Sequence, residues 1–372
     1  MGKEKIKLIV SQADVSEEIK KIAKKIIAEI RIDEQEGILL YEQGELAFLG
    51  ALANFVREKK NAKNVYYNQN FHIEPTNVCI NHCKFCSYRR NLGEDGCWEL
   101  TIGEIADIVR STNLEATEVH IVGGAHPNRD LNYYLNLLAE IKFVRPNIHI
   151  KAFTAVEIDY MAKKAGVSIL DAIEKLKNVG LGSIPGGGAE IFDEKIRAEI
   201  CPDKTSSQDW LMIHKTVHSL GLNSNATMLY GHIEDYAHRI DHMSRLRKLQ
   251  DQTNGFQAFI PLKFRNDKNN LSHLKELTTI EDLKNYAVSR IFLDNIPHIK
   301  AYWPMIGKQT AKLSLSFGVD DLDGTIDDST RIYSMAGAED KSPTMTVEKL
   351  SEIIKSAGFI PIERDSLYKQ FN

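Results

Sequence analysis

The feature that most constrains the fold is an alternation, from residue 65 onward, of short β-prone runs with longer amphipathic stretches. Successive strands of this kind pair in parallel, because each needs a helical crossover to return the chain to the same end of the sheet. Eight strand candidates predict an α/β fold, a closed (β/α)8 barrel of the TIM type; an open doubly wound sheet is the alternative. The candidates are Val65–Glu74, Glu118–Val122, His149–Thr154, Leu181–Ile184, Ser224–Leu229, Phe256–Pro261, Ile299–Trp303 and Ser316–Val319.

One such barrel with extensions accounts for the 372 residues of the chain. Before the first strand, apolar side chains recur at helical spacing in Val15–Ile32, and a second helical stretch covers Glu45–Lys59. The lysines of the first stretch indicate a solvated helix face rather than a nucleic-acid patch. We therefore expect a helical extension over 1–64, the barrel over 65–320 and a C-terminal extension over 321–372, packed on the barrel.

Composition narrows the class of protein. Hydrophobic residues make up 43% of the chain and charged residues 26%, which are globular values, and no apolar run approaches the roughly 20 residues that cross a bilayer. The start, Met1–Lys7, lacks the apolar core of a secretory signal. Five cysteines, three of them crowded together, do not form a disulfide framework. We expect a cytoplasmic protein, and its net charge of −4 offers no general attraction to nucleic acid.

The cysteines lie in Cys79-Ile-Asn-His-Cys83-Lys-Phe-Cys86, directly after the first strand candidate. Thiolates are soft ligands that suit zinc or iron–sulfur clusters, and a four-iron cluster normally takes four of them. Three local thiols leave one iron without a protein ligand, and an open metal position is a place for chemistry. The motif therefore predicts a catalytic cluster bound by Cys79, Cys83 and Cys86.

Other interpretations of the cysteines stay open. The spacing differs from that of ferredoxins, but Cys97 lies close enough in sequence to complete a four-thiolate zinc site or storage cluster, which would indicate a binding or electron-transfer protein. Three unrelated buried cysteines are a further alternative. For Cys201 a buried, small apolar role is the simplest interpretation.

Polar and glycine-rich segments follow other strand candidates. Gly123 and Gly124 allow a ligand to approach the backbone closely, although a tight turn also explains them. His126 is a candidate proton donor or a structural residue. Pro185-Gly-Gly-Gly-Ala-Glu190 opens a helix, where Glu190 is either a ligand for ribose hydroxyls and a sulfonium group or an acid that favours a first helical turn.

Further candidates lie at strand ends or near them. Thr154, Glu157, Tyr230 and His232 belong to the rim of the predicted barrel, where a substrate would bind; packing roles are the alternative. Arg197 and Lys263 are candidates for substrate carboxylates.

The acidic segment Asp320-Asp-Leu-Asp-Gly-Thr325 also suggests a calcium loop. It lacks the complete EF-hand pattern, because Arg331 occupies the position of the final carboxylate.

The three-cysteine motif, with Phe85 before its last cysteine, resembles that of the radical S-adenosylmethionine (SAM) superfamily. Four further segments resemble the aminodeoxyfutalosine synthases of the futalosine route to menaquinone. Cyclic dehypoxanthinylfutalosine synthases and the radical synthases of deazaflavin assembly are close relatives of that family. The segments are Asn70–Cys79, Gly123–Pro127, Pro185–Glu190 and Met228–Glu234.

This resemblance implies a [4Fe-4S] cluster and SAM as cosubstrate. It implies that the segment of Gly123 and Gly124 and the carboxylate of Glu190 contact SAM, and we expect Phe85 and Thr154 to contact it as well. His126, Glu157 and His232 are our catalytic candidates, and Arg197, Tyr230 and Lys263 are our candidates for binding the second substrate. The reaction that the resemblance implies adds a 5′-deoxyadenosyl radical to 3-[(1-carboxyvinyl)oxy]benzoate, followed by rearrangement and decarboxylation. An external flavodoxin or ferredoxin-type protein would supply the electron.

Overall fold

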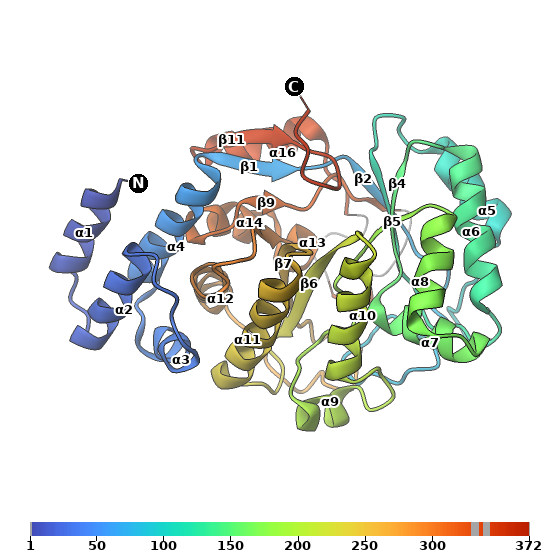
Figure 1. The fold of residues 1–372 in the computed structure, drawn as a ribbon, viewed down its shortest axis with the longest axis horizontal. Coiled ribbons are helices and arrows are strands. Elements are labelled where there is room, and N and C mark those ends of the chain that lie inside the picture. The colour runs from blue at the N-terminus through green and yellow to red at the C-terminus, as the bar shows by residue number, and fades with distance from the viewer. Residues whose placement is uncertain (1, 329–334, 338–342, 372) are drawn as a thin grey trace.

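The computed structural model describes residues 2–328, 335–337 and 343–371. Its centre is a curled sheet surrounded by helices (Figure 1), in which every strand pairing is parallel. The strands are β1 (Asn64–Tyr67), β2 (Asn70–Ile73), β3 (Glu118–Ile121), β4 (His149–Ala152), β5 (Leu181–Ile184), β6 (Asn223–Tyr230), β7 (Phe256–Lys263), β8 (His298–Ala301), β9 (Asp321–Leu322), β10 (Asp327–Asp328) and β11 (Ile360–Glu363).

Strands β2 to β8 pair in chain order, and at least one helix lies between each strand and the next. This confirms the expected α/β fold of the TIM type. The helices of this part of the chain are α5 (Ile102–Ser111), α6 (Leu131–Val144), α7 (Ala155–Ala165), α8 (Ile169–Asn178), α9 (Glu194–Ile200), α10 (Ser207–Ser219), α11 (Tyr236–Thr253) and α12 (Thr279–Phe292). They are followed by α13 (Trp303–Ile306), α14 (Lys308–Ser314), the 3-10 helix η1 (Leu315–Phe317) and α16 (Val347–Ser356).

The two ends of the curl meet along two adjacent extended segments. Strands β1 and β2 are separated only by Asn68 and Gln69, and β9 and β10 are separated by the four residues 323–326. Strand β9 pairs with both β8 and β1, whereas β10 pairs with β2. Between these pairings the amide of Thr325 donates to the carbonyl of Asn68 at 3.1 Å. Residues 321–328 thus connect β8 to the first strands, and β11 adds to the outer side of β1.

The expected strand Ser316–Val319 is wrong. Ser316 and Phe317 belong to η1, and Gly318 caps that helix in a left-handed conformation with φ +98°. The sheet continues instead in the acidic segment that suggested a calcium loop, where Asp321 is buried against Arg364 at 2.7 Å and Asp320 pairs with Arg290. These partners explain why a charged segment occupies the barrel wall, because cations from other elements compensate its carboxylates.

Two helices lie between β4 and β5. Gly166 adopts a left-handed conformation with φ +66° that ends α7, and α8 follows after a short turn.

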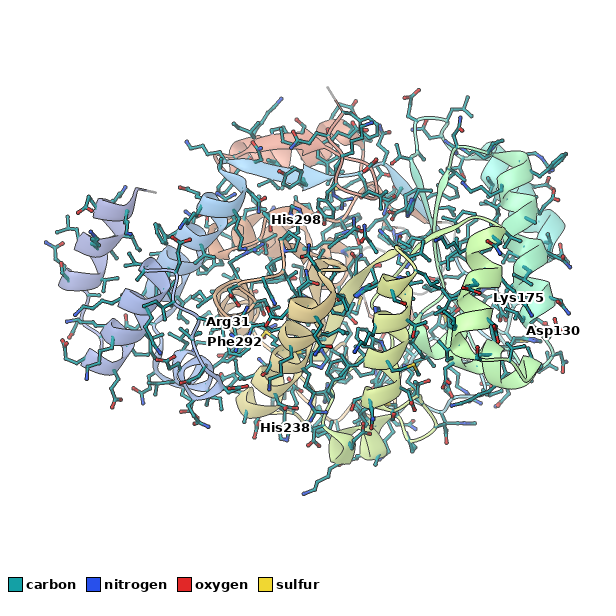
Figure 2. All side chains as sticks on the ribbon, viewed as in Figure 1. Arg31, Asp130, Lys175, His238, Phe292 and His298 are labelled. Carbon is teal, nitrogen blue, oxygen red and sulfur yellow. The ribbon has the colours of Figure 1, made fainter. Side chains whose placement is uncertain are left out.

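The N-terminal helices are α1 (Lys3–Gln12), α2 (Glu17–Ile27), α3 (Glu34–Gln43) and α4 (Leu46–Asn61), and they lie together at one side of the barrel (Figure 1). Helix α2 buries Ile19 and Ile22 while Lys21 and Lys24 are exposed, so the predicted solvated lysine face is confirmed. Arg31, labelled in Figure 2, joins this region to the barrel through hydrogen bonds to Asp251 at 2.5 Å and Asp294 at 3.0 Å.

No helix among residues 2–328, 335–337 and 343–371 is both long and apolar enough to span a membrane. The division into extension, barrel and C-terminal extension at residues 64 and 320 stays a prediction.

Candidate active site

The cysteine loop follows β2 and is held in place by backbone hydrogen bonds on several sides. The amide of Ile80 donates to the carbonyl of Ala125 at 3.0 Å, and the amide of Cys79 donates to that of Arg90 at 3.1 Å. Lys84 donates from its amide to Ile200 at 2.8 Å. Segments from three parts of the chain therefore fix the loop at the carboxyl end of the barrel, where TIM-type enzymes bind their substrates.

Cys79, Cys83 and Cys86 line one cavity of about 200 Å³. Cys97 is not part of its lining. Over the described ranges, no three His, Cys, Asp or Glu side chains are grouped to hold a single metal ion. A tetrahedral zinc site with Zn–S bonds of about 2.3 Å needs such a tight group, whereas a cubic cluster bonds each thiolate to a different iron. The three thiols on one cavity wall match the number of protein ligands that a cluster with one open iron would take.

Gly124 is a glycine because the cysteine loop lies against it. Its amide donates to the carbonyl of Thr76 at 2.9 Å. A Cβ atom at this position would overlap the carbonyl oxygen of Val78 and lie 3.0 Å from Cβ of Cys79. The segment after β3 can therefore contact the cysteine loop only because residue 124 has no side chain.

Glu157 joins the neighbouring elements. Its Oε1 accepts the amide of Gly123 at 3.0 Å, and its Oε2 accepts the amide and hydroxyl of Thr154 at 2.7 and 2.8 Å. Thr154 caps α7 in return by accepting the amide of Glu157. Burial raises the pKa of Glu157 to about 7, although these hydrogen bonds favour the charged form. Gly123, Thr154 and Glu157 all line the cysteine cavity.

A second cavity, of about 330 Å³, extends into the barrel. Phe85 and Thr154 line both cavities, as do Cys86, Tyr88 and Val122, so the two spaces share a wall. Glu190 lines the second cavity, and its Oε1 lies 2.5 Å from Nζ of Lys204, which lines the first. The Lys204 ammonium also stands 5.1 Å from the ring centroid of Phe85.

The remaining sequence candidates have different surroundings. Lys263 lines the second cavity and pairs with Asp282 at 2.8 Å. Tyr230 donates to the same carboxylate at 2.9 Å and is not part of either lining. Arg197 is buried and donates to backbone carbonyls, including that of Ala189 at 2.6 Å.

Neither candidate histidine lines these cavities. His126 lies 2.7 Å from a carboxylate oxygen of Glu99, and its Nδ1 accepts the amide of Asn128 at 3.1 Å. His232 lies 3.2 Å from Glu234 and is buried. Burial lowers the pKa of both imidazoles. Their catalytic roles stay predictions.

Sequence reasoning missed the polar side chains inside the barrel and the cation beside the cysteines. Their signal was polar residues at alternate positions of short strands, as in Glu118-Val-His120-Ile, which places both on one face of β3. Lys204 had no signal, because it lies in an irregular segment after α9. The missed residues of the two linings include Glu118, His120, Lys151, Lys204, Asn225, Lys300 and Asp323.

Comparison with known proteins defines the class. Residues 73–246 match the model of the radical SAM superfamily, and residues 253–372 match the CofH/MqnC C-terminal region. Among solved structures, the hydrogenase maturase HydG from Carboxydothermus hydrogenoformans covers 99% of this chain and 86% of its own at a TM-score of 0.73 and 17% identity, which shows a shared fold. The chain belongs to the radical SAM superfamily.

Within that superfamily the chain is similar to two aminodeoxyfutalosine synthases. It is 44% identical to that of Thermus thermophilus, over 94% of this chain and 95% of the relative, and 41% identical to that of Streptomyces coelicolor, over 94% and 93%. It is also 39% identical to a 5-amino-6-(D-ribitylamino)uracil--L-tyrosine 4-hydroxyphenyl transferase from Methanocaldococcus jannaschii, over 92% and 97%. The superfamily implies a [4Fe-4S] cluster and SAM.

Proposed function

We propose that this protein is an aminodeoxyfutalosine synthase of menaquinone biosynthesis. It joins the 5′-deoxyadenosyl group of SAM to 3-[(1-carboxyvinyl)oxy]benzoate, with rearrangement and loss of a carboxyl group. The observation that carries the proposal is 44% identity to such an enzyme along nearly the whole of both chains. The cavity lined by three cysteines and the adjoining barrel cavity provide the two spaces that this chemistry requires.

Cys79, Cys83 and Cys86 would hold the cluster. Burial raises the pKa of Cys83 to about 12, so a bound iron would have to stabilise its thiolate. When bound, the cluster supplies the single electron that cleaves SAM to a 5′-deoxyadenosyl radical. The adjacent residues would orient SAM: Phe85, Gly123, Gly124, Thr154 and Glu190, with Lys204 as the cation that faces its carboxylate.

The barrel cavity holds the second substrate and excludes water from the radical. Val122, Leu229 and Leu262 contribute apolar surface to this cavity. Such a surface does not hold water near the reacting carbons, so the radical would be protected from side reactions. Lys263 contributes a cation to the same cavity. A reducing cytoplasm would keep the three thiols free to bind the cluster, and a separate flavodoxin or ferredoxin-type protein would deliver the electron.

The test is a product assay under anaerobic reducing conditions. SAM labelled in the adenosyl carbons is incubated with the cluster-loaded protein and the enol-ether substrate, with Cys83→Ala as the control. We expect the label in a carbon–carbon-linked aminodeoxyfutalosine, and none with the variant. Free 5′-deoxyadenosine with a cyclised nucleoside would identify the activity of a cyclic dehypoxanthine futalosine synthase. Product only from L-tyrosine and 5-amino-6-(D-ribitylamino)uracil would identify the transferase instead.

A further inference from the structure

The interior of the barrel is built from ionisable and amide side chains. Branched aliphatic side chains normally fill this space in TIM-type barrels. Here Glu118, Lys151, Asn225 and Lys300 line the barrel cavity, and each is at most 4% exposed. Burying such groups costs free energy unless they are paired within the protein or bind a ligand. A buried group without a full set of partners therefore indicates where a ligand could bind.

The buried ammonium groups of Lys151 and Lys300 differ in how closely their carboxylate partners approach. The Nζ of Lys151 lies 2.6 Å from Oε2 of Glu118. The Nζ of Lys300 lies 3.3 Å from Oδ1 of Asp323 and 3.7 Å from Oδ1 of Asp321. The Asp323 oxygen also accepts the amide of Gly324 at 3.1 Å. The Lys300 ammonium therefore keeps donor capacity for a further acceptor.

Two neutral side chains beside it have unused hydrogen-bonding groups. No hydrogen bond to the side-chain amide of Asn225 occurs among the described residues, although only 4% of this residue is exposed. Likewise, Nε2 of His120 is buried and has no hydrogen-bond partner among the residues that the structure describes. Burial lowers the pKa of His120, so this imidazole is neutral at neutral pH, and in the tautomer that carries its hydrogen on Nε2 it can donate to a ligand. Unpaired buried groups of this kind are unfavourable until a ligand satisfies them.

These donors line the barrel cavity and none of them lines the cysteine cavity. His120 is the third residue of β3 and Asn225 is the third residue of β6, whereas the cysteine loop meets the carboxyl ends of the strands. From His120 to Val122, which borders both cavities, the chain advances about 7 Å at the usual rise per residue of a strand. Between the two ends, Leu229, Ile260 and Leu262 provide apolar walls.

We propose that Lys300, Asn225 and His120 form an anchor for the carboxylate of an aromatic acid, with the ring between the apolar walls and the reacting double bond toward the cysteines. The assignment rests on the proposed function. The anchor formed by Lys300, Asn225 and His120 would bind the benzoate carboxylate of the substrate, and the enol-ether carboxylate would lie toward the cysteine cavity. Lys300 supplies the charge that compensates the carboxylate, and the amide and imidazole supply two further donors.

The test measures binding rather than turnover. Titration calorimetry on the cluster-loaded full chain compares 3-hydroxybenzoate with 3-hydroxybenzamide, which keeps the ring and hydroxyl but lacks the negative charge. We expect the wild-type protein to prefer the carboxylate. Lys300→Met and Asn225→Asp should each weaken its binding roughly tenfold to a hundredfold, the range for a lost charge-assisted hydrogen bond, with little effect on the amide. Lys284→Met is the matched control, because the Lys284 ammonium donates to the carbonyl of Tyr41 outside both linings.

Each outcome decides the proposal separately from the enzyme's activity. No preference in the wild-type protein, or equal losses for both probes in the variants, overturns the anchor even if aminodeoxyfutalosine is formed. Unchanged 3-hydroxybenzoate binding with a raised KM for the enol-ether substrate places the other carboxylate at this site and also overturns the assignment. Carboxylate-selective losses without any product support the anchor and refute the proposed function. If one variant does not fold, the other and the wild-type preference still decide.

Discussion

The carboxylate of Glu157 accepts a hydrogen bond from the backbone amide of Gly123 at 3.0 Å, 34 positions earlier in the chain. Its second oxygen holds Thr154 at the start of α7. One buried side chain thus fixes the glycine-rich end of β3 relative to the neighbouring strand-to-helix turn. Since both segments line the cysteine cavity, Glu157 sets the shape of the space that SAM would occupy.

This buried carboxyl predicts a pH dependence of stability. The pKa of Glu157 is about 7 in the folded protein and ordinarily 4.5. The folded state therefore holds the proton more tightly, so the contribution of Glu157 to the free energy of unfolding is fully present below pH 4.5 and is lost as pH rises through 7. Between pH 5 and 8 the loss is about 2–3 kcal/mol, at 1.36 kcal/mol per unit.

Urea unfolding of the wild-type protein and Glu157→Gln across this range measures that difference. The free energy of unfolding of wild type relative to the variant should fall as pH rises from 5 to 8. A difference that stays flat, or that grows with pH, would show that Glu157 does not titrate as its burial indicates.

Gly124→Ala should disrupt the cysteine loop. The new methyl group would overlap the carbonyl of Val78, so the loop or the end of β3 must shift. We expect a loss of about 1–3 kcal/mol in stability, in the range of overpacked sites, and less iron bound per chain. Differential scanning fluorimetry and iron analysis check both.

Gly103→Ala is the matched control for that substitution. It lies in α5, and its nearest neighbouring atom is the Thr101 hydroxyl oxygen at 3.9 Å. Its stability should be unchanged or raised by up to about 1 kcal/mol, because alanine favours a helix more than glycine does. Equal behaviour of the two variants would contradict the close contact at Gly124.

Lys204→Met should weaken the binding of SAM. Lys204 and Arg89 are the cationic side chains of the cysteine cavity lining, and Lys204 also compensates Glu190. Loss of a charge-assisted hydrogen bond to the SAM carboxylate predicts about a tenfold or greater rise in its Kd. Equilibrium binding of SAM measures this, with Lys195→Met, on the exposed side of α9, as control. An unchanged Kd would remove Lys204 from the SAM site.

Arg197→Lys should lower stability without a selective effect on aromatic acids. The guanidinium donates to the carbonyls of Ala189, Ile191 and Thr205. The ammonium of a lysine cannot make all three of these hydrogen bonds from one position. We expect a loss of about 2–3 kcal/mol, the scale of one or two hydrogen bonds made by a charged group. Chemical denaturation measures it against exposed Arg110→Lys. A selective loss of 3-hydroxybenzoate binding at unchanged stability would instead support the sequence-based role in substrate binding.

The sequence predicted those features of the fold and the site that depend on residues close together in the chain. It did not predict those that depend on partners far apart in the chain. Strand and helix alternation predicted the parallel sheet, and the close spacing of Cys79, Cys83 and Cys86 placed the three thiols on one cavity, where the metal site stays a prediction. The strand at Asp321 was missed because its compensating cation, Arg364, lies 43 residues further along the chain. Lys204 and Glu190 likewise meet only in the folded protein.

The barrel interior shows the same limit. Lys151 and Lys300 each occupy an ordinary short strand, and their convergence on one cavity follows from the curl of the sheet rather than from either segment.

We propose that Cys79, Cys83 and Cys86 hold a four-iron cluster and leave one iron open to SAM. The most direct test of this proposal is electron paramagnetic resonance of the reduced, anaerobically prepared protein with SAM labelled by 17O in the carboxylate and 15N in the amino group, using Cys97→Ala alongside wild type. We predict four irons per chain in both proteins and hyperfine coupling to both labels. A cluster that is lost in Cys97→Ala, or one that shows no coupling to either label, would contradict a three-cysteine cluster with an iron open to SAM.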